Sequence, residues 1–285
     1  MKDYLNYKGA VCVVTGAASG IGKATATILV DLGAEVYSLD IQDCDVAGIK
    51  QHIMVDLADK ASIDNAFAQV PGKIDKFFGI AGVFGYNCDF VTGFTINFIA
   101  NKYMTETYVI PRLTEGEYGA IAFLASVGGS RWLQHVDEYQ DLVEAETWDD
   151  MVAAIKAKPI EGLQGPGQYA LAKRCINYYM KTRAPEIAAK GNRMNTVAPH
   201  YTDTPMLDGI IAAAKAAGRE QNFDSKGAFE RLGTSEDAAM AIIFLNSDMA
   251  VYISGHILYE EGGMQAMIET GRMPVVMDNS YWQQT

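Results

Sequence analysis

The stretch that decides the fold lies near the start of the chain and reads Ala10-Val11-Cys12-Val13-Val14-Thr15-Gly16-Ala17-Ala18-Ser19-Gly20-Ile21-Gly22. Its first five residues form an apolar run that is typical of a buried parallel strand. The chain then places Ile21, Ala24 and Ile28 on one face of a helix. Glycines at such a junction let backbone N–H groups approach a pyrophosphate, whose charge is favoured by the positive end of the helix. The stretch therefore predicts a strand, turn and helix that hold a dinucleotide; the alternative is an ordinary tight turn.

The next predicted strand, Glu35–Asp40, ends in an acid 24 residues after Gly16. A carboxylate at this place can accept hydrogen bonds from both hydroxyls of the adenosine ribose. It would repel the 2′-phosphate of NADP, and neither Ser19 nor Ile41 supplies a cation that could offset this repulsion. Asp40 therefore favours NAD as the cofactor. The alternative is a solvated carboxylate at the end of a strand.

A second informative segment, Tyr169-Ala170-Leu171-Ala172-Lys173, lies past the middle of the chain. Residues four apart share a face of a helix. The Lys173 ammonium can there stabilise a tyrosinate that would otherwise form only near pH 10. Such a tyrosine can act as an acid or a base near neutral pH. Taken alone, the pair is more typical of a surface helix.

The order of these motifs resembles the short-chain dehydrogenases/reductases, and the likeness runs through nearly the whole chain. Asn97 matches the asparagine that this family carries on a helix, and Ser126 matches its active-site serine. Asp56-Leu57 ends the third predicted strand, where the family contacts adenine. Gly79-Ile80-Ala81-Gly82 stands where the family usually has Asn-Asn-Ala-Gly, so two asparagine side chains are missing from this turn.

The resemblance implies a catalytic role for each of Asn97, Ser126, Tyr169 and Lys173. Tyr169 would exchange a proton with the substrate, Ser126 would hold the substrate oxygen, and hydride would move between the carbinol carbon and nicotinamide C4. Lys173 would tune the tyrosine and hold the nicotinamide ribose, and Asn97 would keep a water that links Lys173 to solvent. Motifs and resemblance together predict that the cofactor is bound by Gly16, Ser19, Gly20, Ile21, Gly22, Asp40, Ile41, Asp56, Leu57, Ala81, Gly82, Tyr169, Lys173, Pro199, Thr202 and Thr204.

The segment Asn195–Met206 resembles the one that passes under the nicotinamide in this family, with His200 in place of a glycine. Thr204 is the threonine of the motif, and the backbone of Thr202 would meet the carboxamide. Two alternatives stay open for His200. It either crowds the turn or faces the substrate, or it is a tolerated loop side chain.

An insertion separates Ser126 from Tyr169, because 42 residues lie between them and most of the family has far fewer. The extra element occupies residues 131–168. Its centre predicts two short helices, an acidic one over Asp137–Glu146 and a second that begins at Trp148.

This insertion, together with the ending Glu261–Ile268, resembles the bacterial 3α-hydroxysteroid dehydrogenase/carbonyl reductase branch of the family. That likeness implies a secondary hydroxyl or ketone on a bulky apolar scaffold. Family members are homodimers or homotetramers, which we expect here too, although the insertion could obstruct or remodel the helix face that often forms the dimer.

The substrate end of the predicted site is expected to be apolar. Residues 205–231 would form a lid over it, with a static helical flank as the alternative. The C-terminal extension, residues 264–285, either covers a neighbouring pocket or frays. The apolar side chains that flank the expected pocket, and that could equally belong to the core, are Trp132, Leu133, Tyr201, Met206, Leu207, Ile210 and Ile211.

Composition indicates one soluble domain of 285 residues with a net charge of -12. This charge disfavours nucleic acid or an anionic membrane as a partner. The four cysteines are widely spaced, and neither a secretory segment nor a run of 18 apolar residues is present, so we expect a cytoplasmic protein without a disulfide framework. His52, His135 and His256 have no spacing suited to a metal, so no metal site is predicted.

Strand and helix signals alternate to the end of the chain. They predict an α/β, Rossmann-type, doubly wound sheet of seven parallel strands, near Val11, Val36, Met54, Phe77, Ile121, Met194 and Ile257. The resemblance implies the strand order 3-2-1-4-5-6-7, with the helical insertion before Tyr169. The expected function is an NAD(H)-dependent interconversion of a secondary alcohol and a ketone, on a hydroxysteroid-like substrate. The alternatives are a family member acting on a smaller alcohol, sugar or acyl ketone, and an NAD-binding regulator without turnover.

Overall fold

A computed structural model describes residues 3–86, 88–134, 136–160, 166–216 and 227–273. Its strands form one sheet in the order β3-β2-β1-β4-β5-β6-β7, and every neighbouring pair is parallel, as predicted. The apolar runs of β1 and β5 suit the interior of this sheet, since a strand buried on both faces needs apolar side chains at successive positions. The strands are β1 (Val11–Thr15), β2 (Glu35–Asp40), β3 (Gln51–Met54), β4 (Lys76–Gly79), β5 (Ala120–Leu124), β6 (Arg193–Pro199) and β7 (Ile257–Glu260).

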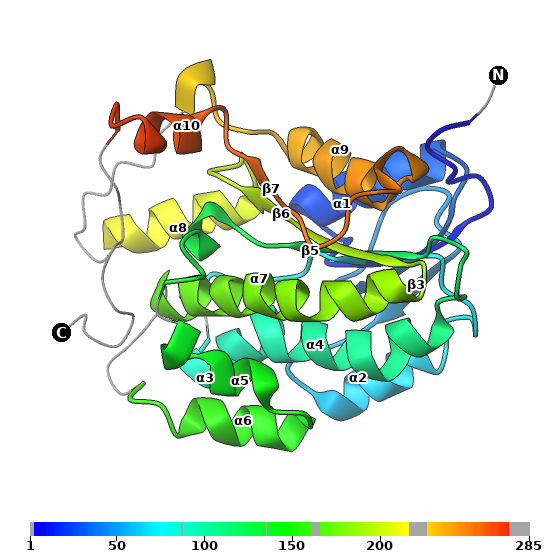
Figure 1. Ribbon diagram of the computed structural model, residues 1–285, viewed down its shortest axis with the longest axis horizontal. Coiled ribbons are helices and arrows are strands. Elements are labelled where there is room, and N and C mark those ends of the chain that lie inside the picture. The colour runs from blue at the N-terminus through cyan, green and yellow to red at the C-terminus, as the bar shows by residue number, and fades with distance from the viewer. Residues whose placement is uncertain (1–2, 87, 135, 161–165, 217–226, 274–285) are drawn as a thin grey trace.

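Helices cover both faces of the sheet (Figure 1). Successive side chains of β1 alternate between two cores, with Cys12 and Val14 on one side and Val13 on the other. Two helices that contact each other, α1 (Gly20–Asp31) and α9 (Ser235–Asn246), cover the first core. The longest helix of the described chain, α7 (Pro166–Ala189), lies on the second core.

The second core is also covered by α2 (Lys60–Phe67) and by a helical stretch that runs from α3 (Phe90–Phe94) through α4 (Ala100–Met104). A π-helical turn follows each of these two helices, over Thr95–Ile99 after α3 and over Thr105–Val109 after α4. Turns of this kind often mark functional sites. The first of them carries Asn97.

The insertion forms two short helices, α5 (Gln140–Glu144) and α6 (Trp148–Lys156), as predicted. They pack against α3 and α7 as an additional layer, below those helices in Figure 1. Their apolar stripe is buried, with Leu142 and Ile155 fully covered. The Lys102 ammonium of α4 donates to the Val143 and Ala145 carbonyl oxygens at 2.6 Å each. The insertion therefore covers part of the α3–α7 face.

Two further helices, α8 (Pro205–Ala216) and α10 (Met264–Glu269), lie beyond the carboxyl ends of the strands. The lid prediction is helical in its first half, while residues 217–226 lie outside the described residues, and so do residues 274–285 of the C-terminal extension.

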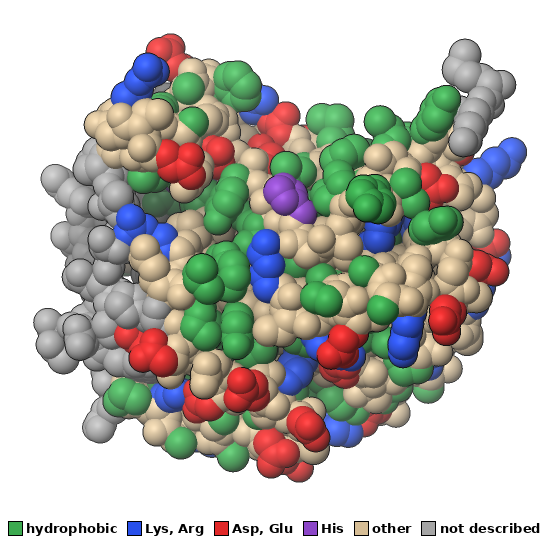
Figure 2. Space-filling view, viewed as in Figure 1, with side chains coloured by type: hydrophobic (Ala, Val, Ile, Leu, Met, Phe, Trp, Pro, Cys, Tyr) green, Lys and Arg blue, Asp and Glu red, His purple; other side chains and the backbone are tan. Residues whose placement is uncertain are grey.

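Charged side chains of both signs are interspersed over the face that carries α5 and α7 (Figure 2). No helix within the described ranges is long and apolar enough to cross a membrane. All four cysteines, which lie in described segments, are unpaired.

Candidate active site

A cleft of about 510 Å³ opens at the carboxyl ends of the strands, beside β1, where the strand order reverses. Ligands of open α/β sheets bind at such a switch point. The cleft brings together most of the predicted site residues from the whole length of the chain. Those that line it are Gly16, Ser19, Gly20, Ile21, Gly22, Asp40, Ala81, Gly82, Ser126, Tyr169, Lys173, Pro199, Thr202 and Thr204.

Two glycines at the junction of β1 and α1, Gly16 and Gly22, have no room for a side chain. Gly16 has φ +74°, and a Cβ on it would lie 2.8 Å from the Ala81 Cα. A Cβ on Gly22 would collide with the Gly16 carbonyl oxygen. Ser19 occupies the N-cap of α1 without a side-chain cap bond. The first N–H groups of α1 therefore lack a side-chain acceptor, and the turn fits a pyrophosphate.

Asp40 lies where β2 ends and lines the cleft beside this turn. Its carboxylate oxygens accept hydrogen bonds from the backbone N–H groups of Ala18 at 2.9 Å and Gln42 at 3.0 Å. The nearby cation of α1, Lys23, forms an ion pair with Asp45 at 2.6 Å. The carboxylate is therefore held in a fixed orientation, with lone pairs left to accept from the hydroxyls of a ribose.

The turn after β4, which lacks the two asparagines, is held by other side chains. The Thr15 hydroxyl accepts from the backbone N–H groups of Ile80 at 3.0 Å and Ala81 at 3.1 Å. A Cβ on Gly79 would lie 2.6 Å from the Asn101 Oδ1, so the turn also packs closely against α4. The Thr15 hydroxyl therefore holds the backbone of the turn from which the two asparagines are missing.

Asn97 does not line the cleft but is fully buried behind it. Its Oδ1 accepts from the Val83 N–H at 2.8 Å, and its Nδ2 donates to the Val83 carbonyl at 2.7 Å. Gly82 separates it from the reacting groups, since a Cβ there would lie 2.9 Å from Asn97 Oδ1 and 3.7 Å from Lys173 Nζ. Asn97 therefore fixes the backbone beside Lys173, and its predicted water stays a prediction.

Tyr169 and Lys173 share one face of α7, as their spacing predicts. The Lys173 ammonium donates to the Leu124 carbonyl at 2.5 Å and lies 5.3 Å from the centre of the Tyr169 ring. Burial raises the pKa of Tyr169, and an interaction with the Ser126 hydroxyl opposes this shift. Burial lowers the pKa of Lys173 to about 8. Burial is the largest cause of the Tyr169 shift, and the predicted stabilisation of a tyrosinate by Lys173 stays a prediction.

The substrate end of the cleft is apolar, as expected, but only part of its wall was predicted. Tyr201, Met206, Leu207 and Ile210 line it. Leu133 and Ile211 are exposed instead, and Trp132 stacks on Tyr178. The sequence analysis missed wall residues from the loop after β4, from the segment after Ser126, from α10 and from the chain just after α10. They are Phe84, Val127, Ser130, Met264, Gln265, Ile268 and Met273.

These missed residues answer one open question. Met264, Gln265 and Ile268 belong to α10, so the first part of the C-terminal extension covers the cleft rather than fraying. The apolar spacing of α10 was the signal that could have identified it. Phe84 follows Gly82 by two residues, and its ring centre lies 5.0 Å from that of Tyr169.

Three more predicted cofactor residues lie outside the lining of the cleft. Ile41 is 60% exposed, and Leu57 is buried in the second core. The Asp56 carboxylate accepts from the Ala58 N–H at 2.8 Å. Their contacts with a cofactor stay predictions. In the part of the chain that the structure describes, no three His, Cys, Asp or Glu side chains form a group that could hold a metal ion.

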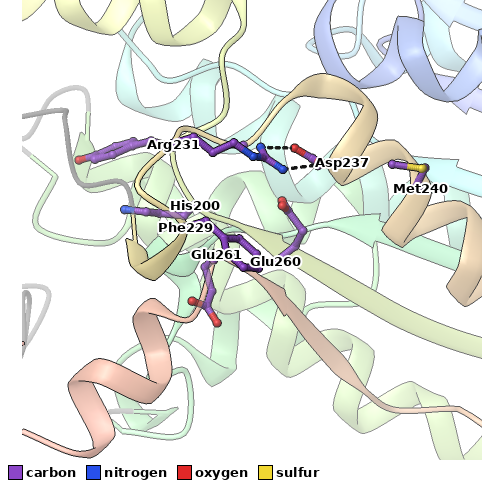
Figure 3. A pocket seen from close by; sticks show the side chains of 10 residues that line it. His200, Phe229, Arg231, Asp237, Met240, Glu260 and Glu261 are labelled. Atoms are coloured by element: carbon purple, nitrogen blue, oxygen red, sulfur yellow. Dashed lines mark hydrogen bonds and ion pairs between the residues drawn. The ribbon is translucent and has the colours of Figure 1, made fainter. Parts of the chain in front are cut away.

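His200 lies on the wall between the cleft and a second cavity of about 210 Å³. Its ring stacks on Tyr201 with centres 4.4 Å apart, and its backbone N–H donates to the Glu260 carbonyl at 3.0 Å. In Figure 3 the Glu260 side chain points toward the Arg231–Asp237 ion pair. Burial and the Asp237 charge raise the pKa of Glu260 to about 7. His200 is thus a packed residue that lines both cavities, and its role toward the substrate stays a prediction.

Comparisons with known proteins identify the family of the chain. Residues 10–140 match the family model described as short chain dehydrogenase, and residues 151–265 match the one described as Enoyl-(Acyl carrier protein) reductase. A coniferyl-alcohol dehydrogenase of a Pseudomonas species is 28% identical over 253 residues, which cover 88% of this chain and 95% of that protein. A 3-oxoacyl-(acyl-carrier-protein) reductase of Thermotoga maritima is 26% identical over 276 residues, covering 91% of this chain and 99% of that protein.

Among solved structures, a 3-alpha-hydroxysteroid dehydrogenase from a Pseudomonas species, complexed with NADH, has the same fold. The TM-score is 0.74 at 24% identity, over 92% of this chain and 99% of that one. The two proteins are thus similar in the arrangement of their strands and helices. The cleft and these matches together show that the chain belongs to the short-chain dehydrogenase/reductase family of nicotinamide-dependent oxidoreductases.

Proposed function

We propose that this protein is an NAD(H)-dependent oxidoreductase that interconverts a secondary alcohol and a ketone. One observation carries the proposal: Ser126, Tyr169 and Lys173 line the same cleft as the glycine turn and Asp40. A proton-transfer group, a hydrogen-bond donor and a dinucleotide site then face one volume.

The residues of the cleft have distinct chemical tasks in this proposal. The glycine turn holds the pyrophosphate, and the bound nicotinamide supplies the hydride donor or acceptor. The Tyr169 hydroxyl transfers a proton to or from the substrate oxygen, and the Ser126 hydroxyl donates a hydrogen bond to that oxygen. Lys173 holds the nicotinamide ribose, and its charge beside the phenol favours the ionised form of Tyr169 during the transfer.

NAD rather than NADP follows from the charge at the adenosine end. A 2′-phosphate would lie against the Asp40 carboxylate, and the nearest cation of α1, Lys23, is already paired with Asp45. Ile41, the residue after Asp40, is exposed and carries no charge. This end of the cleft therefore repels the extra phosphate.

A bulky apolar substrate, such as a hydroxysteroid, suits the other end. Phe84, Met206, Ile210 and Ile268 form much of its wall, and few charged side chains lie there. The likeness to the hydroxysteroid dehydrogenase structure agrees with this class. A smaller alcohol, a sugar or an acyl ketone is the second candidate, and it is favoured by relatives that act on coniferyl alcohol or 3-oxoacyl groups.

We further propose a cytoplasmic homodimer or homotetramer that acts on small molecules. Because α5 and α6 cover part of the α3–α7 face, a dimer that uses this face would include the insertion. Ser126 and Tyr169 together disfavour a binding-only regulator, since a protein that only binds NAD needs neither a proton-transfer group nor a hydrogen-bond donor for a substrate oxygen.

The experiment is an absorbance assay at 340 nm with NAD or NADP. Its substrates are 3-, 7-, 12- and 17-hydroxysteroids beside small secondary alcohols and sugars. NAD-linked turnover of one steroid position supports the full proposal. Activity only on small alcohols keeps the chemistry and removes the steroid class. NAD binding with no turnover of any substrate supports the regulator.

A further inference from the structure

Gln168, the residue directly before Tyr169, is fully buried although glutamine is usually an exposed residue. It lies in the first turn of α7, directly before Tyr169, which lines the cleft. A buried amide is costly unless its polar atoms are hydrogen-bonded. Its position beside the reacting tyrosine therefore calls for a reason.

Its partners are the two groups that hold the backbone beside Lys173. Gln168 Oε1 accepts from Asn97 Nδ2 at 3.2 Å, and Gln168 Nε2 donates to the Val83 carbonyl at 3.4 Å. Val83 and Asn97 are themselves joined by two hydrogen bonds, at 2.8 and 2.7 Å. We call Val83, Asn97 and Gln168 the amide cluster. It joins the start of α7 to the π-helical turn and to the loop after β4.

Two glycines leave the space that the Gln168 amide fills. A Cβ on Gly85, which has φ +90°, would collide with Gln168 Nε2. A Cβ on Gly93, in α3, would lie 2.7 Å from the same amide. The site is therefore shaped for this side chain on two sides, and no larger neighbour fits beside it.

The amide cluster also reaches the reacting groups on both sides. Phe84, which follows Val83, packs on the Tyr169 ring with centres 5.0 Å apart. Gly82, which precedes Val83, lies between Asn97 and Lys173. A shift of the Val83 backbone would therefore move the wall against Tyr169 and the neighbour of Lys173 together.

We propose that Gln168 is a positioning residue: through the amide cluster it fixes the start of α7, and so the Tyr169 hydroxyl, relative to Lys173 and the Phe84 wall. The expected effect of Gln168 on turnover rests on the proposed function. Its expected effect on the surroundings of Tyr169 rests on the geometry alone.

The test compares Gln168→Met, which keeps the length of the side chain and loses both hydrogen bonds, with Gln140→Met on the exposed surface of α5. We expect kcat to fall about 10- to 100-fold in Gln168→Met, because small displacements of reacting groups have effects of this size. KM for NAD should stay within about twofold. Gln140→Met should match the parent. A kcat within about twofold of the parent would overturn the proposal.

A second readout does not depend on turnover. The ionisation of Tyr169 can be followed as the ultraviolet difference between each protein and the same protein carrying Tyr169→Phe. Loss of the amide cluster admits water to the start of α7, so the raised pKa of Tyr169 should move down in Gln168→Met. An unchanged titration midpoint would overturn the proposal even if the protein proved to have no turnover at all.

Gly93→Ala separates positioning from packing. Alone, it should displace the Gln168 amide and lower both kcat and the melting temperature. Combined with Gln168→Ala, which vacates the space, the alanine at position 93 should cost little further stability, while kcat stays low. Full recovery of kcat in the double variant would show that only packing matters and would overturn the positioning role.

Discussion

The two ends of the cleft are built in different ways. The cofactor end is fixed by backbone contacts: Gly16 and Gly22 have no room for a Cβ, and two backbone N–H groups orient the Asp40 carboxylate. The substrate end consists of side chains from α8, α10 and the loop after β4, which are far apart in the sequence. The first kind of site leaves a compact signature in the sequence, whereas the second exists only after folding.

The largest effect is expected where the backbone admits no change. Gly22→Ala places a methyl group against the Gly16 carbonyl, so the turn must open, and we expect NAD affinity to fall more than about 100-fold together with a lower melting temperature. Gly72→Ala is the control, because nothing lies within 4 Å of the added Cβ. Titration of NAD by protein fluorescence measures the effect. Equal affinities of the two variants would contradict a turn built on close backbone contact.

Lys173→Met tests how much the burial of the Lys173 charge lowers the free energy of unfolding. A buried lysine whose pKa is lowered to about 8 costs free energy of folding while it stays protonated. This cost has its full size below pH 8, and it disappears as the pH rises toward the pKa of a lysine in the unfolded chain. Lys173→Met should therefore be more stable than the parent by about 2–3 kcal/mol at pH 7, and this advantage should shrink by pH 10.

Urea unfolding of the two proteins at pH 7 and pH 10 gives this difference, with the exposed Lys156→Met as the control. A variant that is less stable than the parent at pH 7 would show that the hydrogen bond to Leu124 outweighs the burial of the charge.

Asp40→Ala tests cofactor choice. The carboxylate offers two charge-assisted hydrogen bonds to the ribose, so its loss should weaken NAD about 10- to 100-fold and leave NADP less affected. The ratio of kcat/KM for the two cofactors measures the change. Asp43→Ala, an exposed acid three residues further on, should keep the parent's ratio. If both variants keep it, Asp40 is only a solvated strand end.

Ile268→Ala tests the substrate end of the cleft, and its expected effect is the smallest of those predicted. Removing this wall residue of α10 should raise KM for a bulky apolar substrate about tenfold, while the NAD affinity stays the same. Met267→Ala on the same helix does not touch the cleft and serves as the control. A loss of NAD affinity in Ile268→Ala would mean that the two ends of the cleft are not independent.

Much of the fold could be predicted because the signals are local. The seven predicted strands and the helices of the insertion were confirmed, and the strand order implied by the resemblance was confirmed as well. Ser126 could be assigned to the cleft because it follows a strand and parallel strands end at the same edge of a sheet, whereas Tyr169 and Lys173 were assigned to it through the family resemblance.

The rest depends on contacts between distant segments. Nothing near Gln168 in the sequence indicates that Gly85 and Gly93 leave room for its amide. Trp132 and Leu133 are as apolar as Met206, yet only Met206 reaches the cleft. The pKa of Tyr169 also could not be obtained from spacing, because desolvation depends on everything that surrounds the phenol.

The central claim is that Tyr169 transfers the proton in a reaction in which NAD exchanges hydride with the substrate. Tyr169→Phe tests this claim most directly. Turnover with NAD and the best substrate of the panel should fall at least about 1000-fold, because the acid/base group is lost. The dissociation constant of NAD, measured by titration, should stay within about threefold of the parent, because the glycine turn and Asp40 are intact. Retained turnover in Tyr169→Phe would contradict the account.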